Sequence, residues 1–370
     1  MNYSLALALK IKYTTQSINR KMSVLKNINN VKRTVLQALT KNVGTSLSAN
    51  GGKLNKADIK RVLIVRPNHR LGNQLLITPI VEDVTNFFPD AKIDLFVKGN
   101  VAPIIFQNYK NIDHILRLPK QHFKQLLQYI KGWLSIRKEY YDIVINVVPN
   151  SSSGRLLTKF ARGKYKFYGD DVEELQQKYS DYQHIAKNPV YNFRYCLSKL
   201  GVSCDYNEIP SLNIKLSSSE IATGKELLDK LVTDKNKKTI SIYTYATGAK
   251  CYDETWWLEF HKRLKLEYPN HNILEILPVE NVSQILFKEP SLYSKDIREM
   301  AAVIANTEVF ISADGGVMHL ASAAQIPVIG LFSVTSIGRY EPYNGKSKGL
   351  DTNNLTNDEI ISEINKNILA

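Results

Sequence analysis

Cysteine is scarce in this sequence of 370 residues, and no long hydrophobic run occurs in it. The three cysteines, Cys196, Cys204 and Cys251, are odd in number and lack the paired spacing of metal ligands, which argues against a disulfide framework and a zinc site. The apolar stretch at Val328–Phe332 is far shorter than the roughly 20 residues that a membrane span needs. No positive segment precedes the apolar residues Leu5–Leu9, so no secretory signal is predicted. These absences favour a protein of a reducing compartment with free thiols.

Acidic residues are missing from the start of the chain. Residues 1–57 hold ten Lys or Arg and no Asp or Glu, whereas the other 313 residues hold 39 basic and 35 acidic ones. The net charge of +14 therefore comes mainly from a basic N-terminal extension. The length of the chain suits two domains behind this extension.

Within the extension, apolar residues recur at intervals of three and four, which predicts an amphipathic helix. They are Ile18, Met22, Leu25, Ile28, Val31, Val35 and Leu39. Such a helix in the basic region 10–41 suits an anionic membrane surface, where each Lys or Arg adds about 1 kcal/mol. The alternative is a helix packed on the protein with its charged face in solvent. Nucleic-acid binding is not expected, because no recognition motif accompanies the charges. The Ser/Gly/Asn-rich stretch 44–56 predicts a linker.

From Ile59 onward, short apolar runs alternate with helical patterns, which predicts parallel sheets covered by helices on both faces. The polar run Lys235–Lys238 interrupts this pattern, and it then starts again. We therefore predict an α/β protein with two Rossmann-like doubly wound domains that face a cleft. The predicted divisions are an extension at 1–57, an N-terminal domain at 58–232 and a C-terminal domain at 233–370. Ligands of such sheets bind beyond the carboxyl ends of the strands.

The most informative segment is Val309–Phe332, in which a predicted strand ends at Asp314 and a helix follows at once. Gly315 and Gly316 allow a ligand to approach the backbone closely, and the free N–H groups of a helix start can bind an anion. His319 lies in the first turn, where it can reach the same ligand. The segment suits a pyrophosphate with a sugar beside it. The alternative is a simple strand–turn–helix with a capping Asp.

A second segment, Val65–Pro79, repeats the order of strand, loop, glycine and helix start in the N-terminal domain. It brings Asn68, His69, Arg70 and Asn73 to a helix N-terminus that faces the predicted cleft. We expect Asn68 and Arg70 to contact an acceptor.

Two further loops carry polar groups. In Thr244–Trp257, Lys250 follows a predicted strand end and suits a phosphate, although a single loop lysine is usually solvated. In Asn146–Arg155, the side chains of Ser152, Ser153 and Arg155 could grip a polar or anionic acceptor. The alternative for this last loop is a polar turn that caps the next helix.

Over residues 60–343, the four segments together resemble glycosyltransferase family 9, the ADP-heptose:lipopolysaccharide heptosyltransferases of the GT-B fold. One marker is Asp314-Gly-Gly-x-x-His319, followed by Leu-Ala-x-Ala, Pro327, Leu331-Phe332 and Arg339-x-x-Pro342-Tyr343. The other is the strand Val62–Arg66 with Gly72, Leu75 and Thr78-Pro79. The family usually has Ser or Thr where this chain has Gly315.

The resemblance implies an inverting transfer of a heptose from ADP-heptose to lipopolysaccharide core or a related glycolipid, with no obligatory metal and no further cofactor. Asp314, Gly315, Gly316 and His319 would contact the diphosphate and sugar of the donor. Lys250 would neutralise the leaving diphosphate, and Glu280 would take the position of a ribose-binding carboxylate. The implied place of work is the cytoplasmic face of the inner membrane, as a peripheral protein.

The general base is where this sequence departs from the family, which commonly has Asp directly after the glycine of the first loop. Here that residue is Asn73, which cannot accept a proton as a carboxylate does. Three explanations stay open. His69 serves as the base, since its ordinary pKa of about 6.5 suits the task; Asn73 orients the acceptor while Asp170 or Asp171 acts; or the activity is altered or lost. The corresponding alternatives for function are transfer of another sugar and a non-catalytic nucleotide-sugar-binding protein.

Overall fold

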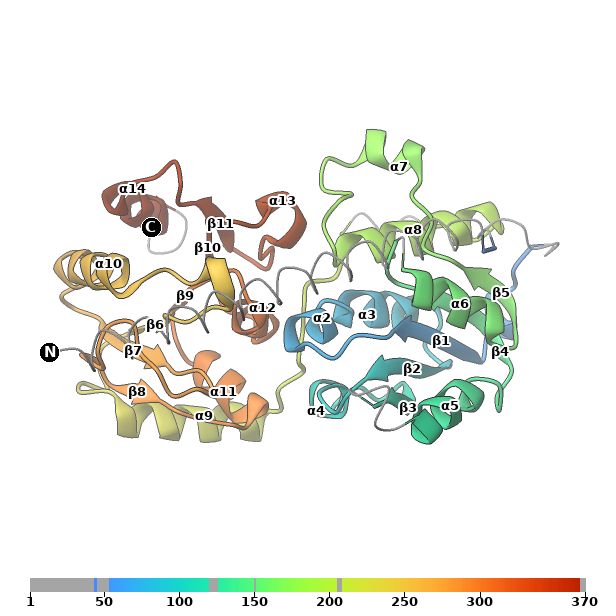
Figure 1. Cartoon of the computed structure of the whole chain (residues 1–370), viewed down its shortest axis with the longest axis horizontal. Helices are drawn as coiled ribbons and strands as arrows, with labels where there is room; N and C mark the ends of the chain where they lie inside the picture. The colour runs from blue at the N-terminus through green and yellow to red at the C-terminus, as the bar shows by residue number, and fades with distance from the viewer. Residues whose placement is uncertain (1–42, 45–52, 120–125, 150, 205–207, 367–370) are drawn as a thin grey trace, which may run out of the picture.

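A computed structural model describes residues 43–44, 53–119, 126–149, 151–204 and 208–366 (Figure 1). The amphipathic helix predicted within residues 10–41 lies outside the described residues, as does much of the predicted linker. In the part of the chain that the structure describes, no helix has the length and apolar character needed to cross a membrane.

The N-terminal half is built on a parallel sheet in which the described residues supply five strands in the order β3-β2-β1-β4-β5. The strands are β1 Arg61–Arg66, β2 Lys92–Lys98, β3 Ile112–Leu118, β4 Tyr141–Asn146 and β5 Gly163–Phe167. The helices of this half are η1 Lys56–Asp58, α2 Leu71–Leu75, α3 Thr78–Phe87, α4 Ala102–Ile105, α5 Leu126–Ser135, α6 Ser152–Phe160, α7 Glu173–Lys178 and α8 Lys187–Lys199.

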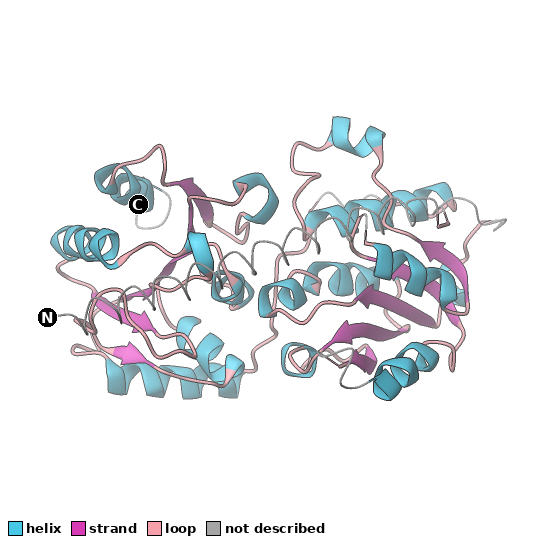
Figure 2. Cartoon of the chain, viewed as in Figure 1, coloured by secondary structure: helices cyan, strands magenta, loops and turns pink. Residues whose placement is uncertain are grey.

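The C-terminal half has a second parallel sheet, with described strands in the order β11-β10-β9-β6-β7-β8. The strands are β6 Thr239–Tyr243, β7 Asn272–Ile276, β8 Ser291–Leu292, β9 Val309–Ala313, β10 Val328–Phe332 and β11 Lys348–Asp351. The helices are α9 Ser218–Leu231, η2 Gly248–Lys250, α10 Glu254–Glu267, α11 Ile297–Ile304, α12 Gly316–Ala323, α13 Ile337–Tyr340 and α14 Asn357–Ile364. The two halves lie side by side (Figure 2), and α2 and α12 face each other between them (Figure 1).

Apolar residues on both sides of the central strands explain why helices cover both faces of the sheets. Along β1, Val62 and Ile64 pack into one cluster while Leu63 and Val65 pack into another on the opposite face. Successive strand residues point to opposite faces, so a continuous apolar run needs cover on both. The prediction of two doubly wound α/β halves is therefore confirmed.

One apolar cluster continues from the N-terminal half into the C-terminal half. It includes Ile64 and Leu75 on one side and Met318 and Leu320 on the other, all fully buried. The core thus runs through the junction of the two sheets.

The helical pattern after the first strand predicts one helix from about Asn73 to Phe88. This prediction is wrong, because the chain forms two helices, α2 and α3, in this region. Pro79 lies in the first turn of α3, where its missing N–H costs nothing, but it could not continue a helix from α2. The Thr78 hydroxyl donates to the carbonyl of Leu75 at 2.7 Å and accepts from the backbone N–H of Asn213 at 3.1 Å.

Helix α9 packs on α11 of the C-terminal half. Gly224 of α9 lies so close to Ala302 of α11 that an added Cβ would stand 2.3 Å from the Ala302 carbonyl oxygen. The boundary expected between residues 232 and 233 therefore falls after a helix that packs on the C-terminal half, and residues 208–217 form the connection before α9.

Candidate active site

The order of strands reverses once in each sheet. The first reversal lies between β1 and β4, and the second lies between β6 and β9, because the chain builds outward in both directions from these pairs. Open α/β sheets bind their ligands beyond the carboxyl ends of the strands at such points. All four segments singled out from the sequence follow one of these four strands, so the two topologies bring them to comparable positions in the two halves.

In the C-terminal half, Lys250 and Asp314 form an ion pair. The Lys250 Nζ lies 2.5 Å from Asp314 Oδ2, and the Thr335 hydroxyl donates to the same oxygen at 2.7 Å. Asp314 is 4% exposed, so a buried carboxylate at the end of β9 is held by a cation and a hydroxyl. The sequence did not single out Thr335, which follows β10 in a polar loop.

His319 is buried one turn into α12. Its Nε2 lies 4.0 Å from Asp314 Oδ1, and its ring centroid is 6.5 Å from that of Tyr340. Burial lowers the pKa of His319 to about 4; the Asp314 charge opposes this shift, and the Lys250 charge adds to it. The imidazole is therefore neutral at pH 7 and can donate or accept a hydrogen bond there.

The start of α12 has no side-chain cap. Gly315, its N-cap residue, has φ −173° and ψ −179°, an extended conformation that any residue adopts. A Cβ there would meet only the carbonyl oxygen of Ala313, at 3.7 Å. The Ser or Thr usual in the family would fit, and glycine at this position leaves the helix start without a capping hydroxyl.

The first loop of the N-terminal half meets the start of α12. A Cβ added to Gly72 would lie 3.0 Å from His319 Cδ2 and 3.2 Å from Gly316 Cα. A side chain at position 72 would therefore require α12 or the His319 ring to shift by a few tenths of an ångström. The sequence predicted Gly316 as a ligand-approach position and Gly72 as the glycine before a helix start, but not that the two face each other.

Within the same loop, the Asn73 side chain is bound by Arg66 at the end of β1. The Arg66 Nη2 donates to Asn73 Oδ1 at 2.7 Å. The Asn68 Oδ1 accepts from the backbone N–H of Arg70 at 2.9 Å, and the side chains of His69 and Arg70 are exposed. Sequence reasoning passed over Arg66 because it stands inside the apolar strand.

The loop after β4 is used for internal contacts. Ser151 caps α6, since its Oγ accepts from Gly154 N at 3.1 Å, while Ser152 is half-buried and Ser153 is exposed. The Arg155 Nη1 lies 2.6 Å from Asp170 Oδ1, and its Nη2 donates to the carbonyl of Gly44 at 2.5 Å. The predicted acceptor role of these residues stays a prediction, and Arg155 and Asp170 are already paired with each other. Asp171 is exposed.

Glu280 is exposed after β7, close enough to Tyr243 for its charge to contribute to the raised pKa of that phenol. A second carboxylate, Glu275, was missed by the sequence analysis although it interrupts an apolar strand. It is fully buried, accepts from Thr244 Oγ1 at 2.6 Å and from Ser283 Oγ at 2.7 Å, and burial raises its pKa. It ties the loop after β6 to the loop after β7.

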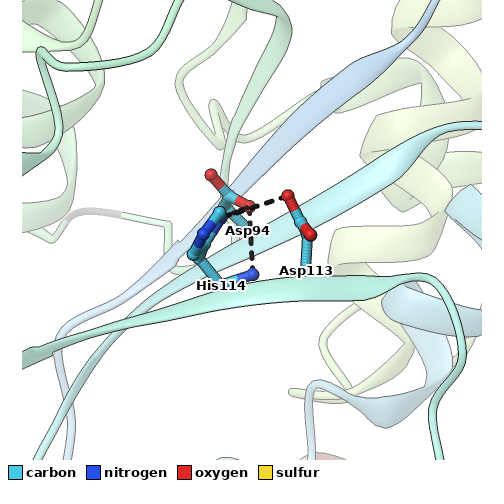
Figure 3. Close-up of side chains that lie close together, drawn as sticks. All are labelled: Asp94, Asp113 and His114. Carbon is cyan, nitrogen blue, oxygen red and sulfur yellow. Dashed lines mark hydrogen bonds and ion pairs between the residues drawn. The ribbon is translucent and has the colours of Figure 1, made fainter.

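One group of potential metal ligands occurs among the described residues, formed by Asp94, Asp113 and His114 (Figure 3). The guanidinium of Arg61 already occupies it, because Nη2 lies 2.9 Å from Asp94 Oδ2 and 3.0 Å from Asp113 Oδ2. The group stands near the amino ends of β1, β2 and β3, at the opposite edge of the sheet from the loops described above. It is best described as an ion-pair network.

Comparisons with known proteins agree with this geometry. A model of the family described as glycosyltransferase family 9 (heptosyltransferase) matches residues 292–365, a stretch that contains β9 and α12. The chain is 23% identical over 316 residues to lipopolysaccharide heptosyltransferase 1 of Campylobacter coli. The aligned residues cover 79% of this chain and 89% of that protein.

Two solved structures share the fold. One is a family 9 glycosyltransferase from Veillonella parvula, with a TM-score of 0.64, 16% identity and coverage of 85% of this chain and 99% of that chain. The other is the Escherichia coli heptosyltransferase WaaC with ADP, with a TM-score of 0.61, 19% identity and coverage of 83% and 99%. The resemblance inferred from the sequence motifs is confirmed. This chain is similar to glycosyltransferase family 9 and is a glycosyltransferase of the GT-B fold.

Proposed function

We propose that this chain transfers a heptose from ADP-heptose to lipopolysaccharide core or a related glycolipid. The observation that carries the proposal is the Lys250–Asp314 pair beside the uncapped start of α12. Support also comes from the relatives, which include lipopolysaccharide heptosyltransferase 1 of Campylobacter coli, and from the Escherichia coli neighbour, which was solved with ADP.

The C-terminal half, with residues 233–370 as its predicted extent, would bind the donor. The N–H groups at the start of α12 suit a diphosphate, since a helix N-terminus attracts negative charge. Lys250 would turn from Asp314 toward the leaving diphosphate and stabilise the charge that develops on it. Gly315, Gly316 and His319 would contact the diphosphate and sugar, and Glu280 the ribose.

The N-terminal half, predicted at 58–232, would bind the acceptor through Asn68, Arg70, Ser152, Ser153 and Arg155. The acceptor oxygen forms a bond to the anomeric carbon while the bond from that carbon to the diphosphate oxygen breaks. The electron pair leaves with ADP, and the anomeric configuration inverts.

A general base takes the proton of the acceptor hydroxyl. His69 is exposed in the first loop and is one candidate. The other is a carboxylate, with Asn73 orienting the acceptor. Of the two carboxylates considered, Asp170 is engaged by Arg155, whereas Asp171 is exposed.

A specific observation favours a second candidate, a protein that binds a nucleotide sugar without transferring it. Asn73 stands where the family commonly has Asp, and its Oδ1 accepts from Arg66. An amide in this arrangement takes no proton, so a chain with no other base would retain only binding.

The first experiment is calorimetric titration with ADP, UDP, GDP and ADP-heptose, followed by a measurement of ADP release from ADP-heptose with a lipopolysaccharide-core acceptor. Preference for the adenine ligands with acceptor-dependent ADP release supports heptosyl transfer. Preference for UDP or GDP would indicate that the enzyme uses a donor with a sugar other than heptose. Adenine binding without release would favour the non-catalytic candidate, and binding of none of the ligands would contradict the proposal.

The basic extension would hold the enzyme at the cytoplasmic face of the inner membrane, with residues 10–41 on the anionic surface. Deletion of residues 1–50 should leave the protein folded, as measured by circular dichroism. It should reduce the amount of protein that sediments with anionic vesicles. Equal sedimentation of the full and shortened chains would refute this role.

A further inference from the structure

Arg66 is a buried cation without an anionic partner. Its residue exposure is 4%, its Nη2 donates to the neutral amide of Asn73, and its Nε has no hydrogen-bond partner. In the part of the chain that the structure describes, no carboxylate lies within ion-pair distance of it. Burial lowers the pKa of Arg66 to about 10, so the guanidinium still carries its charge at neutral pH.

The other buried arginines of the described residues show how unusual this is. Each has a carboxylate at 2.5–2.6 Å: Arg155 with Asp170, Arg194 with Asp83, and Arg298 with Glu220. A buried charge is costly unless a counterion and hydrogen bonds compensate it. The fold supplies a counterion for every buried arginine described except the one at the end of β1, beside the candidate active site.

Two residues of α13, from the opposite half, act on the charge of Arg66. Tyr340 raises the pKa of Arg66 slightly against the effect of burial, whereas Arg339 brings a second positive charge and lowers it. The Tyr340 ring lies 6.0 Å from Lys250 Nζ and 6.5 Å from the His319 ring centroid. Tyr340 thus lies near both Arg66 and Lys250, and Asp314 is already held by Lys250.

We propose that Arg66 binds an oxyanion, a phosphate or carboxylate group that a substrate brings to the junction of the two halves. The inference rests on the proposed function for the identity of that substrate, either the donor diphosphate or an anionic group of the acceptor. Asn73 is the positioning residue. Its amide holds the guanidinium through one hydrogen bond and leaves the positive charge free, whereas a carboxylate at position 73 would neutralise it.

The test compares Arg66→Gln, Arg66→Lys and Asn73→Asp with the natural chain. Calorimetry measures the affinity for ADP, and then the affinity of the ADP-saturated protein for inorganic phosphate. We expect Arg66→Gln and Asn73→Asp each to weaken one of these affinities about tenfold, the value of a charge-assisted contact. Arg66→Lys should keep part of the affinity that Arg66→Gln loses. A weaker ADP affinity assigns the oxyanion to the donor, and a weaker phosphate affinity assigns it to the acceptor.

Asn73→Asp also has a second readout, because it leaves Arg66 in place. The new ion pair should raise the melting temperature while it weakens anion binding, a combination that general damage to the fold would not produce. Arg263→Gln, which removes an arginine paired with Asp358 at the surface of the C-terminal half, is the matched control and should change neither affinity.

The inference is overturned when Arg66→Gln and Asn73→Asp bind both ADP and phosphate like the natural chain. Should Arg66→Gln fail to fold, Asn73→Asp alone decides the matter. A natural chain that binds no nucleoside diphosphate contradicts the proposed function instead. In that case phosphate titration of the ligand-free protein still tests Arg66.

Discussion

The ends of β9 and β1 treat buried charge in opposite ways. At the end of β9, the carboxylate of Asp314 has Lys250 and Thr335 as partners within 2.7 Å. At the end of β1, Arg66 has only the neutral oxygen of Asn73. A compensated charge is stable without a ligand, whereas an uncompensated one gains stability when a ligand of opposite sign binds. The buried charge of the C-terminal half is therefore neutralised within the protein, whereas the buried charge of the N-terminal half can be neutralised by a bound ligand.

The largest effect is expected when the cation that compensates the charge of Asp314 at the end of β9 is removed. Lys250→Met should lower the rate of donor turnover about 100- to 1,000-fold, because one stabilising group for the developing negative charge is lost. It also leaves Asp314 buried with Thr335 alone, so the melting temperature should fall. Steady-state ADP release and thermal unfolding measure the two effects.

The matched control is Lys238→Met, which removes a lysine paired with Glu308 before β6, at the opposite edge of the same sheet. Its turnover should equal that of the natural chain. An equal loss in both variants would mean that Lys250 contributes only stability.

A change of pH tests the contact that a histidine of the N-terminal half makes with the C-terminal half. The Nε2–H of His184 donates to the carbonyl of Glu341 at 2.9 Å, and burial lowers the pKa of His184 to about 4. The unfolded chain therefore binds more protons than the folded chain between about pH 6.5 and 4, and stability falls as pH falls through this window. From pH 7 to pH 5, the natural chain should lose about 2 kcal/mol more unfolding free energy than His184→Gln.

Urea unfolding at pH 7, 6 and 5 measures this difference. Parallel pH curves for the natural chain and His184→Gln would disprove the role assigned to His184.

A methyl group added at the contact between α2 and α12 would push the end of β1 away from the end of β9. Gly72→Ala places a Cβ 3.0 Å from His319 and 3.2 Å from Gly316. Alanine favours helix by up to about 1 kcal/mol over glycine, which offsets part of the cost of the clash. We expect a stability close to that of the natural chain and about tenfold slower turnover, since misplacement of reacting groups is costly.

Gly338→Ala provides the comparison, because a Cβ at that position would meet nothing within 4 Å. Full turnover by Gly72→Ala would show that the closeness of α2 and α12 is not needed for catalysis.

The smallest expected effect concerns the cap of α12. Gly315→Ser fits the extended backbone and supplies a capping hydroxyl, but glycine is itself a tolerated N-cap, so the substitution should stabilise the protein by only a few tenths of a kcal/mol. The same hydroxyl would occupy an N–H that the donor diphosphate is proposed to use, and ADP affinity should fall a few-fold. Chemical denaturation and calorimetry provide the two values; a gain in both would show that the hydroxyl contacts the ligand.

Much of the fold could be predicted because apolar runs and their interruptions are local features. The apolar runs at 92–98 and 328–332 predict strands, and the structure has strands at these residues. The four polar loops follow the strands at which the strand order reverses. The break between α2 and α3 was missed although Pro79 signals it. The helical periodicity on either side of that break concealed it.

The partners of buried polar groups could not be predicted, because they depend on which loops meet in space. The pattern before α6 showed hydroxyls and an arginine, but not that Ser151 is the cap or that Arg155 is paired with Asp170. Arg66 resembled the end of an ordinary strand, and its lack of a carboxylate is visible only once all its neighbours are known. Glu275 could have been found, since a carboxylate within a buried strand needs bonding partners.

The apolar cluster that passes from Ile64 and Leu75 to Met318 bears on the timing of each catalytic cycle. A nucleotide sugar that binds beside α2 and α12, as proposed, would enter and leave near their junction. Parting the junction would expose apolar surface to water at a cost of about 25 cal/mol per Å². The packing of the junction would therefore slow the release of the spent nucleotide, so that release would contribute to the time of each turnover together with bond cleavage.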